Sequence, residues 1–116
     1  MEEGQIKTKA KEKILKQGGI VWFVSPVKYK AEIDIFGAFD GIIIYPPGNI
    51  VFIQLTTISN IRAREKKINQ FLRRTRTSLY SEIWAYDKKL KDFRIFHIYG
   101  GGKARERSEI NLSLLK

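Results

Sequence analysis

Residues 34–67 read DIFGAFDGIIIYPPGNIVFIQLTTISNIRAREKK, and this stretch decides the fold. Apolar runs at 39–45 and 50–56 flank the turn-forming sequence PPGN at 46–49, so we expect an antiparallel hairpin. Both runs are almost continuously apolar, which indicates that both faces of the hairpin are covered. From 59 to 76 the apolar spacing becomes helical. The stretch therefore predicts two paired strands followed by a basic helix.

The flanking segments add a helix before the hairpin and strands on both sides of it. Residues 5–17 are good helix formers, and Gly18-Gly19 after them is typical of a C-terminal cap. Aromatic and β-branched runs at 20–25, 83–86 and 93–98 predict three further strands. The expected order is helix, three strands, helix, two strands. Burying these strands requires a helix on each side, so we expect an α/β fold with a mixed central sheet flanked by helices.

Length and charge limit the classes of function. The chain has 116 residues, which predicts a single domain spanning 1–116, with a basic and flexible tail at 100–116. Lys and Arg number 22 against 12 Asp and Glu, a net charge of +10. Such an excess favours a polyanionic partner, and nucleic acid is preferred over a membrane surface.

Several other classes are excluded by residue counts. The chain has no cysteine and one histidine, so disulfides, thiolate metal sites and multi-histidine zinc sites are excluded. No apolar run approaches the roughly 18 residues that a membrane span requires, and the first residues lack the apolar core of a secretory signal. We therefore expect no membrane partner and an intracellular, cytoplasmic protein.

Polar residues at the strand ends form a candidate site. Asp40 begins the second strand, and Gln54 and Thr56, which point to one face, end the third. A four-residue loop would place Asp40 and Gln54 on opposite faces of the sheet. A bulge at Gly41, or a loop one residue longer or shorter, restores a shared face, and we predict such an irregularity.

The helix after the hairpin contributes cations. At 100° per residue, Arg64 falls between Ile68 and Phe71, on the side that faces the sheet. A helix seldom places Arg there unless a carboxylate or phosphate partner is present. The alternative is a structural Arg at the edge of this sector, paired with Asp40 or Asp34. The candidate nucleic-acid-binding residues are Lys7, Lys11, Asn60, Arg62, Arg64, Lys67, Arg73 and Arg74.

At these residues the chain resembles the PD-(D/E)xK nuclease superfamily, which includes restriction enzymes and archaeal Holliday junction resolvases. In that superfamily an Asp starts the second strand and an acid-x-Lys triplet lies on the third. Asp40 matches the first element, whereas the triplet here is Gln54-Leu55-Thr56. Variants with Gln in the triplet look like a branch of the superfamily in which a cation of the following helix replaces the lysine. The usual Glu of the first helix has no clear counterpart.

The resemblance implies a metal-dependent endonuclease that hydrolyses phosphodiester bonds in DNA, with branched and single-stranded DNA among the candidate substrates. The implied cofactor is Mg²⁺ or Mn²⁺, with Asp34, Asp40 and Gln54 as ligands. The implied catalytic residues are Asp40, Gln54, Thr56, Arg64 and Lys67. Small nucleases of this fold often act as dimers, so a homodimer is an open alternative to a monomer.

Two other functions stay open. The altered triplet also suits a catalytically degenerate, nuclease-like protein that binds nucleic acid without cleaving it. A basic protein–protein adaptor, for instance in a viral or mobile-element complex, needs no site at all. His97 is expected to be structural. Four aromatic residues are expected in the core, namely Trp22, Trp84, Tyr86 and Phe96.

Overall fold

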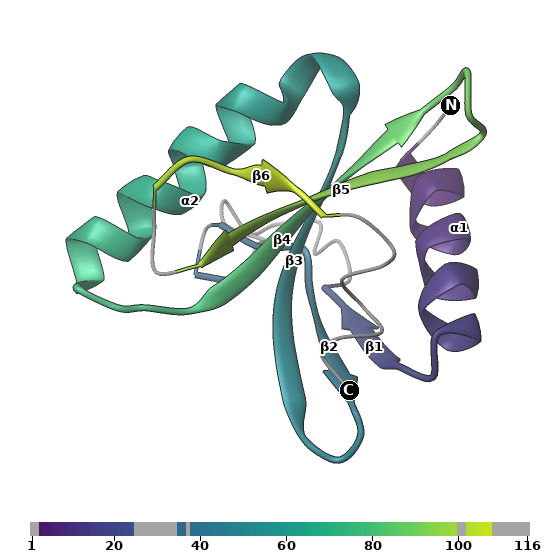
Figure 1. Cartoon of the computed structure of the whole chain (residues 1–116), viewed down its shortest axis with the longest axis horizontal. Helices are drawn as coiled ribbons and strands as arrows, with labels where there is room; N and C mark the ends of the chain where they lie inside the picture. Colours follow the sequence, from purple (N-terminus) through teal and green to yellow (C-terminus); the bar gives the residue numbers. More distant parts are fainter. Residues whose placement is uncertain (1–2, 25–34, 37, 100–101, 108–116) are drawn as a thin grey trace, which may run out of the picture.

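A mixed sheet with one helix on each face forms the structure (Figure 1), a computed structural model that describes residues 3–24, 35–36, 38–99 and 102–107. The elements in chain order are α1 (Glu3–Lys16), β1 (Ile20–Phe23), β2 (Gly41–Tyr45), β3 (Asn49–Thr57), a 3-10 turn η1 (Ile58–Asn60), α2 (Ile61–Thr75), β4 (Tyr80–Asp87), β5 (Asp92–Tyr99) and β6 (Arg105–Glu106). The sheet order is β1-β2-β3-β4-β5-β6. Within it β3 and β4 are parallel, and the other neighbours are antiparallel. The predicted α/β fold class is confirmed.

The first helix ends as its sequence predicts. Gly18 adopts a left-handed φ of 83°, and the Gly19 amide donates to the Ile14 carbonyl at 2.9 Å. Gly19 has a second constraint, because a Cβ there would lie 2.7 Å from the ring of Tyr45. The two glycines therefore end α1 and allow the chain to enter β1 directly beneath it.

The hairpin register follows one of the predicted irregularities. Tyr45 pairs with Asn49, so the turn has three residues, one fewer than PPGN suggests. Gly41 pairs regularly with Phe23 and with Ile53, so the alternative of a bulge at Gly41 is wrong. The glycine instead permits close packing of β1, since a Cβ would lie 2.6 Å from the Trp22 carbonyl oxygen. The shorter turn puts Asp40 opposite Gln54.

Alternation along the strands produces two cores. On one face, α1 packs Ile14 against Ile43, Ile53 and Trp84, all fully buried or nearly so. On the other face, the buried residues of α2 are Ile68, Phe71 and Leu72, which pack with Phe39, Ile83 and Ile98. Trp84 and Tyr86 are buried as predicted and Phe96 is half-buried, but the prediction for Trp22 is wrong, because its side chain is 59% exposed. Helix α2 covers β3 and β4 on this face of the sheet and does not extend over β1.

Two segments need separate mention. Residues 25–34, which include Asp34, lie outside the described part of the chain, as do 108–116 of the predicted tail. Within the tail, Arg105–Glu106 pairs with β5 as β6, an element that the sequence did not predict. No helix in the described ranges is long and apolar enough to span a bilayer.

Candidate functional site

Asp40 makes hydrogen bonds to β3 just beyond the point where pairing with β2 ends. Its amide donates to the Ile53 carbonyl at 2.8 Å, and β2 begins at the next residue. Its carboxylate atom Oδ2 accepts the Leu55 amide at 2.6 Å and the Gln54 Nε2 amide at 2.9 Å. The two groups predicted to share a face are therefore in direct contact. Asp40 holds the main chain of β3 at the point where the β2 ladder ends.

Three buried polar atoms of β3 and α2 lack a hydrogen-bond partner in the described part of the chain. Among the described residues, five buried side-chain nitrogen or oxygen atoms make no hydrogen bond within the protein, and three of these are Gln54 Oε1, Thr56 Oγ1 and Arg64 Nε. Gln54 and Thr56 end β3, Arg64 is in the first turns of α2, and these two elements pack together. An unsatisfied buried polar group costs roughly 1–3 kcal/mol, so such a concentration indicates a place where a ligand supplies the missing partners.

The cations of α2 divide as the helical wheel predicts. Arg64 and Lys67 are half-buried beside the apolar sector, whereas Arg62, Lys66 and Arg73 are exposed on the outer side. Asn60 occupies the N-cap position of α2 without a side-chain capping bond, and its amide donates to Thr57. Of the two half-buried α2 cations, Arg64 is therefore nearer along the chain to the end of β3 than Lys67.

The structure does not gather all the predicted nucleic-acid-binding residues at this site. Arg73 and Arg74 are in the last turn of α2, about 14 Å along the helix from Arg64 at 1.5 Å per residue. Lys11 is exposed on α1, on the opposite face of the sheet. Lys7 is also on α1, but its ammonium reaches the Val24 carbonyl at 3.1 Å, next to the backbone of Asp40. Asp34 lies outside the described residues.

Comparison with known proteins gives a distant structural likeness. No protein-family model matches the chain, and no curated protein matches it. The chain is similar to the crystal structure of a Holliday junction resolvase from the archaeal hyperthermophile Archaeoglobus fulgidus, at 9% sequence identity. The match covers 96% of this chain and 92% of that chain, with a TM-score of 0.47. The likeness is remote. Function is therefore inferred from the residues of this chain.

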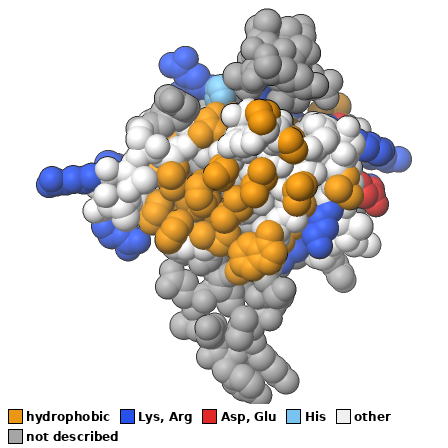
Figure 2. All heavy atoms as spheres, turned by 90° about the horizontal axis from the view of Figure 1, so that it is seen from below, with side chains coloured by type: hydrophobic (Ala, Val, Ile, Leu, Met, Phe, Trp, Pro, Cys, Tyr) orange, Lys and Arg blue, Asp and Glu red, His pale blue; other side chains and the backbone are white. Residues whose placement is uncertain are grey.

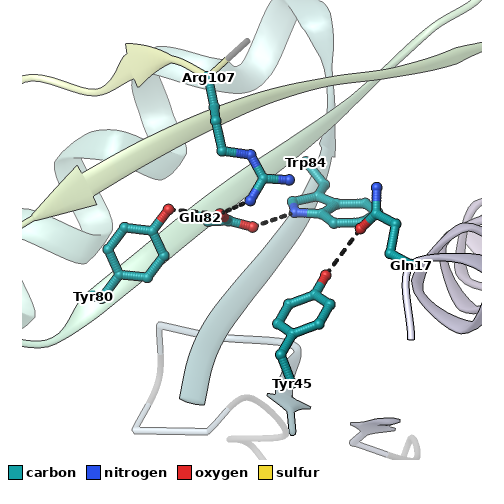
Figure 3. A network of polar contacts seen from close by, with 6 residues as sticks. All are labelled: Gln17, Tyr45, Tyr80, Glu82, Trp84 and Arg107. Carbon is teal, nitrogen blue, oxygen red and sulfur yellow. Dashed lines mark hydrogen bonds and ion pairs between the residues drawn. The ribbon is translucent and has the colours of Figure 1, made fainter. Parts of the chain in front are cut away.

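A second polar cluster lies on the opposite face of the sheet, beneath α1 (Figure 3). Glu82 of β4 is fully buried and accepts from Tyr80 at 2.7 Å, from the Trp84 indole at 2.9 Å and from Arg107 at 2.6 Å. Burial raises the pKa of Tyr45 to about 12, and the nearby negative charge of Glu82 adds to the increase. Burial and Glu82 likewise raise the pKa of Tyr80. The cluster is a buried ion pair between Glu82 and Arg107, with the neutral hydroxyl groups of Tyr45 and Tyr80 nearby.

This second cluster was missed by the sequence-based reasoning. Its signal is a single acid, Glu82, inside the otherwise uncharged run YSEIWAY at 80–86, where a buried charge must have a partner. Its partner, Arg107, is in the tail predicted to be flexible, so no local pattern connects the two. Glu82 and Arg107 pair directly, although Arg107 Nη2 is buried without a hydrogen-bond partner in the described part of the chain. Because the two opposite charges are buried against each other, the cluster is interpreted as structural.

Proposed function

We propose that the protein is a metal-dependent endonuclease that hydrolyses phosphodiester bonds in DNA. The observation that supports this function is the set of unpartnered buried atoms of Gln54, Thr56 and Arg64 on two elements that pack together, with Gln54 in contact with the Asp40 carboxylate. Two of the atoms are oxygens suited to a cation, and one is a guanidinium donor suited to a phosphate. A net charge of +10 supplies the attraction for a nucleic-acid backbone.

The donor set fits a hard divalent cation. Asp40 offers a carboxylate, and the orphaned Oε1 of Gln54 and Oγ1 of Thr56 offer neutral oxygens. No group of three or more His, Cys, Asp or Glu gathers within the described ranges. The second carboxylate that we propose, Asp34, lies outside those ranges. When bound, Mg²⁺ or Mn²⁺ would generate hydroxide from water and neutralise charge at the phosphate.

The residues of α2 would hold the nucleic acid. The half-buried Arg64 can donate to a phosphate oxygen and stabilise the charge that develops during hydrolysis. Lys67, one turn further along the same side, adds a second positive charge. The exposed Arg62 and Lys66 can contact phosphates on either side of the scissile bond, which positions the strand without reading its sequence.

One contact favours a second candidate, a nuclease-like protein that binds DNA without cleaving it. The amide of Gln54 donates to Asp40 Oδ2 at 2.9 Å. If residue 54 were an acid, two carboxylates would face each other and would need a cation between them. Here an N–H group lies between the two side chains instead. This bond links the two side chains directly, although Gln54 Oε1 makes no hydrogen bond within the described residues. Rotation of the amide by half a turn would present Oε1 to Asp40 instead, and only a bound cation would favour that orientation.

A cleavage assay separates the two candidates. Purified protein is incubated with branched, single-stranded and duplex DNA in Mg²⁺, in Mn²⁺ and in excess EDTA. We expect cleavage with either metal and none in EDTA, while binding persists in EDTA and weakens steeply with added salt. Binding without cleavage under every metal condition would establish the second candidate. Absence of binding at about 50 mM salt would contradict both, because a domain of this charge should bind phosphates there.

The substitution Gln54→Glu tests whether the site is built around a cation. It places a second carboxylate against Asp40, so without metal the protein should be less stable than wild type. Saturating Mg²⁺ should then raise its free energy of unfolding by about 1–3 kcal/mol, measured by chemical denaturation, and change the wild-type value less. Gln54→Met removes the amide without adding charge and should show no response. Equal responses to Mg²⁺ in the wild type and Gln54→Glu would contradict a site centred on residues 40 and 54.

A further inference from the structure

Phe36 is held in an exposed position just before the candidate site. The backbone amides of Ile35 and Phe39 each donate to the other residue's carbonyl, at 2.7 and 3.0 Å, so the chain turns tightly ahead of Asp40. Ala38 and Phe39 anchor this turn in the core beneath α2. Phe36, in contrast, is 55% exposed and has a left-handed φ of 56°. Bulky residues rarely adopt this conformation, so a phenylalanine at this position indicates a role other than folding.

The ring of Phe36 stacks on a buried ring of α2. Its centre is 5.2 Å from that of Phe71, with 12° between the two planes, and 6.3 Å from the ring centre of Phe52. Phe71 is itself fixed by an edge contact with Phe39 at 5.9 Å. Phe36 is thus supported on one side, and its exposed area offers a flat aromatic surface. We call Phe36 and Phe71 the aromatic platform.

The aromatic platform lies in a row of cations along α2. Intervals of three and four residues place a set of side chains on one side of the helix, over about 15 Å at 1.5 Å per residue; the set is Arg64, Lys67, Phe71 and Arg74. The guanidinium carbon of Arg74 is 6.0 Å from the ring centre of Phe71. At the other end of the row, Arg64 Nε is buried without a hydrogen-bond partner among the described residues. The platform therefore has cations on both sides.

Phe52 connects the aromatic platform to the candidate site. Phe52, Gln54 and Thr56 alternate along β3 and therefore project from the same face of the sheet. Consecutive members of this row are about 7 Å apart at their Cα atoms. A bound strand that reaches the unpartnered oxygens of Gln54 and Thr56 is therefore close enough to place a base against Phe36, which contacts Phe52.

The exposed aromatic residue of β1 has different neighbours. Figure 2, which views the end of the molecule where β1 and the β2–β3 hairpin lie, shows a broad field of apolar side chains with Lys and Arg towards its margins. The strands β1, β2 and β3 contain no Lys or Arg, so Trp22, although 59% exposed, has no cation beside it on its own strand or the next. Proteins that bind single-stranded nucleic acid combine aromatic side chains with cations. Phe36 fits that combination better than Trp22.

We propose that the aromatic platform stacks on an unpaired base, so that the protein selects DNA with an unpaired nucleotide beside the phosphate held at the candidate site. This inference rests on the proposed endonuclease function and names its class of substrate. Stacking uses the flat face that every base has, so the preference is for an unpaired base and not for a sequence. The cations on both sides of the platform contact the phosphates that flank this base.

Binding measured in EDTA tests the platform without requiring cleavage. Two duplexes that carry the fluorescent adenine analogue 2-aminopurine are compared, one with the analogue paired and one with the opposite nucleotide omitted, so that the analogue is unpaired. We expect the full-length chain to bind the second duplex at least about 5-fold more tightly. Added salt should weaken both affinities and leave their ratio unchanged, because stacking releases no counterions.

Substitutions of Phe36 separate stacking from simple apolar contact. Phe36→Leu keeps an apolar side chain without an aromatic face and should bring the ratio of the two affinities to about 1, whereas Phe36→Trp should retain the preference. The 2-aminopurine fluorescence should be lower in the wild-type complex than in the Phe36→Leu complex. Leu90→Ala, at a side chain 63% exposed in the β4–β5 turn, is the control and should leave both affinities unchanged.

Failure of the platform and failure of the endonuclease give different results. Equal affinity of the wild type for the two duplexes, or a preference that Phe36→Leu retains, would overturn the platform even if the protein cleaves DNA. A preference that is lost in Phe36→Leu would support the platform even if no DNA is cleaved in Mg²⁺ or Mn²⁺, a result that would contradict the endonuclease alone.

Discussion

Replacing Asp40 with asparagine should lower the rate of DNA cleavage by at least about 100-fold, with the free energy of unfolding within about 1 kcal/mol of the wild-type value. The reason is that Asp40 Oδ2 accepts both the Leu55 and the Gln54 amides, and the amide oxygen of asparagine can accept the same two bonds. Only the negative charge is lost, and with it the proposed hold on the cation. Cleavage is measured under single-turnover conditions, and stability by urea denaturation.

Asp40→Ala is the matched variant for the structural part of this role. It leaves the Leu55 amide without its acceptor and Gln54 Nε2 with only the Leu55 carbonyl at 3.2 Å, so it should lower the free energy of unfolding by about 2–3 kcal/mol as well as abolish cleavage. A stable Asp40→Asn variant that cleaves DNA at the wild-type rate would show that Asp40 only supports the strand. A nuclease activity retained in both variants would belong to another site or to a contaminant.

Glu82→Ala should produce the largest loss of stability, about 3–5 kcal/mol, out of the roughly 5–15 kcal/mol typical of a small domain. The substitution leaves the guanidinium of Arg107 buried beside Tyr80 and the Trp84 indole without an acceptor. The side chains of Glu82 and Arg107 are 0% and 4% exposed, so water cannot replace the carboxylate. The measurement is the free energy of unfolding from urea or thermal denaturation.

Paired substitutions separate charge burial from packing. Glu82→Met combined with Arg107→Met removes both charges and should recover most of the loss, because apolar replacement of a buried ion pair is often neutral. Lys13→Gln breaks the more exposed ion pair with Asp92 and should cost at most about 1 kcal/mol. A loss in Glu82→Ala no larger than that of Lys13→Gln would show that the buried pair contributes little.

Local sequence patterns were enough to predict the order of elements from α1 to β5 and, through a loop of altered length, a shared face for Asp40 and Gln54. Glycine pairs, turn residues and apolar periods are local, and they located α1, the hairpin and α2 to within a few residues. The inward position of Arg64 followed from helical geometry alone. The need for glycine at position 41 could not be predicted from local sequence, because it comes from the close packing of β1 against this residue.

The rest depended on which surfaces meet in three dimensions. Alternation along β1 placed Trp22 on a definite face, but not whether a helix covers that face, so its exposure was not predictable. The buried pair joins Glu82 to a residue 25 positions later in the chain. The catalytic roles of all the predicted site residues stay predictions, namely those of Asp40, Gln54, Thr56, Arg64 and Lys67, as does that of Asp34, which lies outside the described residues.

The bond from the Leu55 main chain to Asp40 has a consequence for how such a site can evolve. The same oxygen atom that secures the end of β3 is the one a ligand would recruit, at 2.6 Å from the amide that it now serves. Any tightening of Asp40 around a ligand withdraws support from the backbone of the strand. In the proposed nuclease, activity and stability would therefore oppose each other at Asp40, and a neutral Gln54 would favour stability.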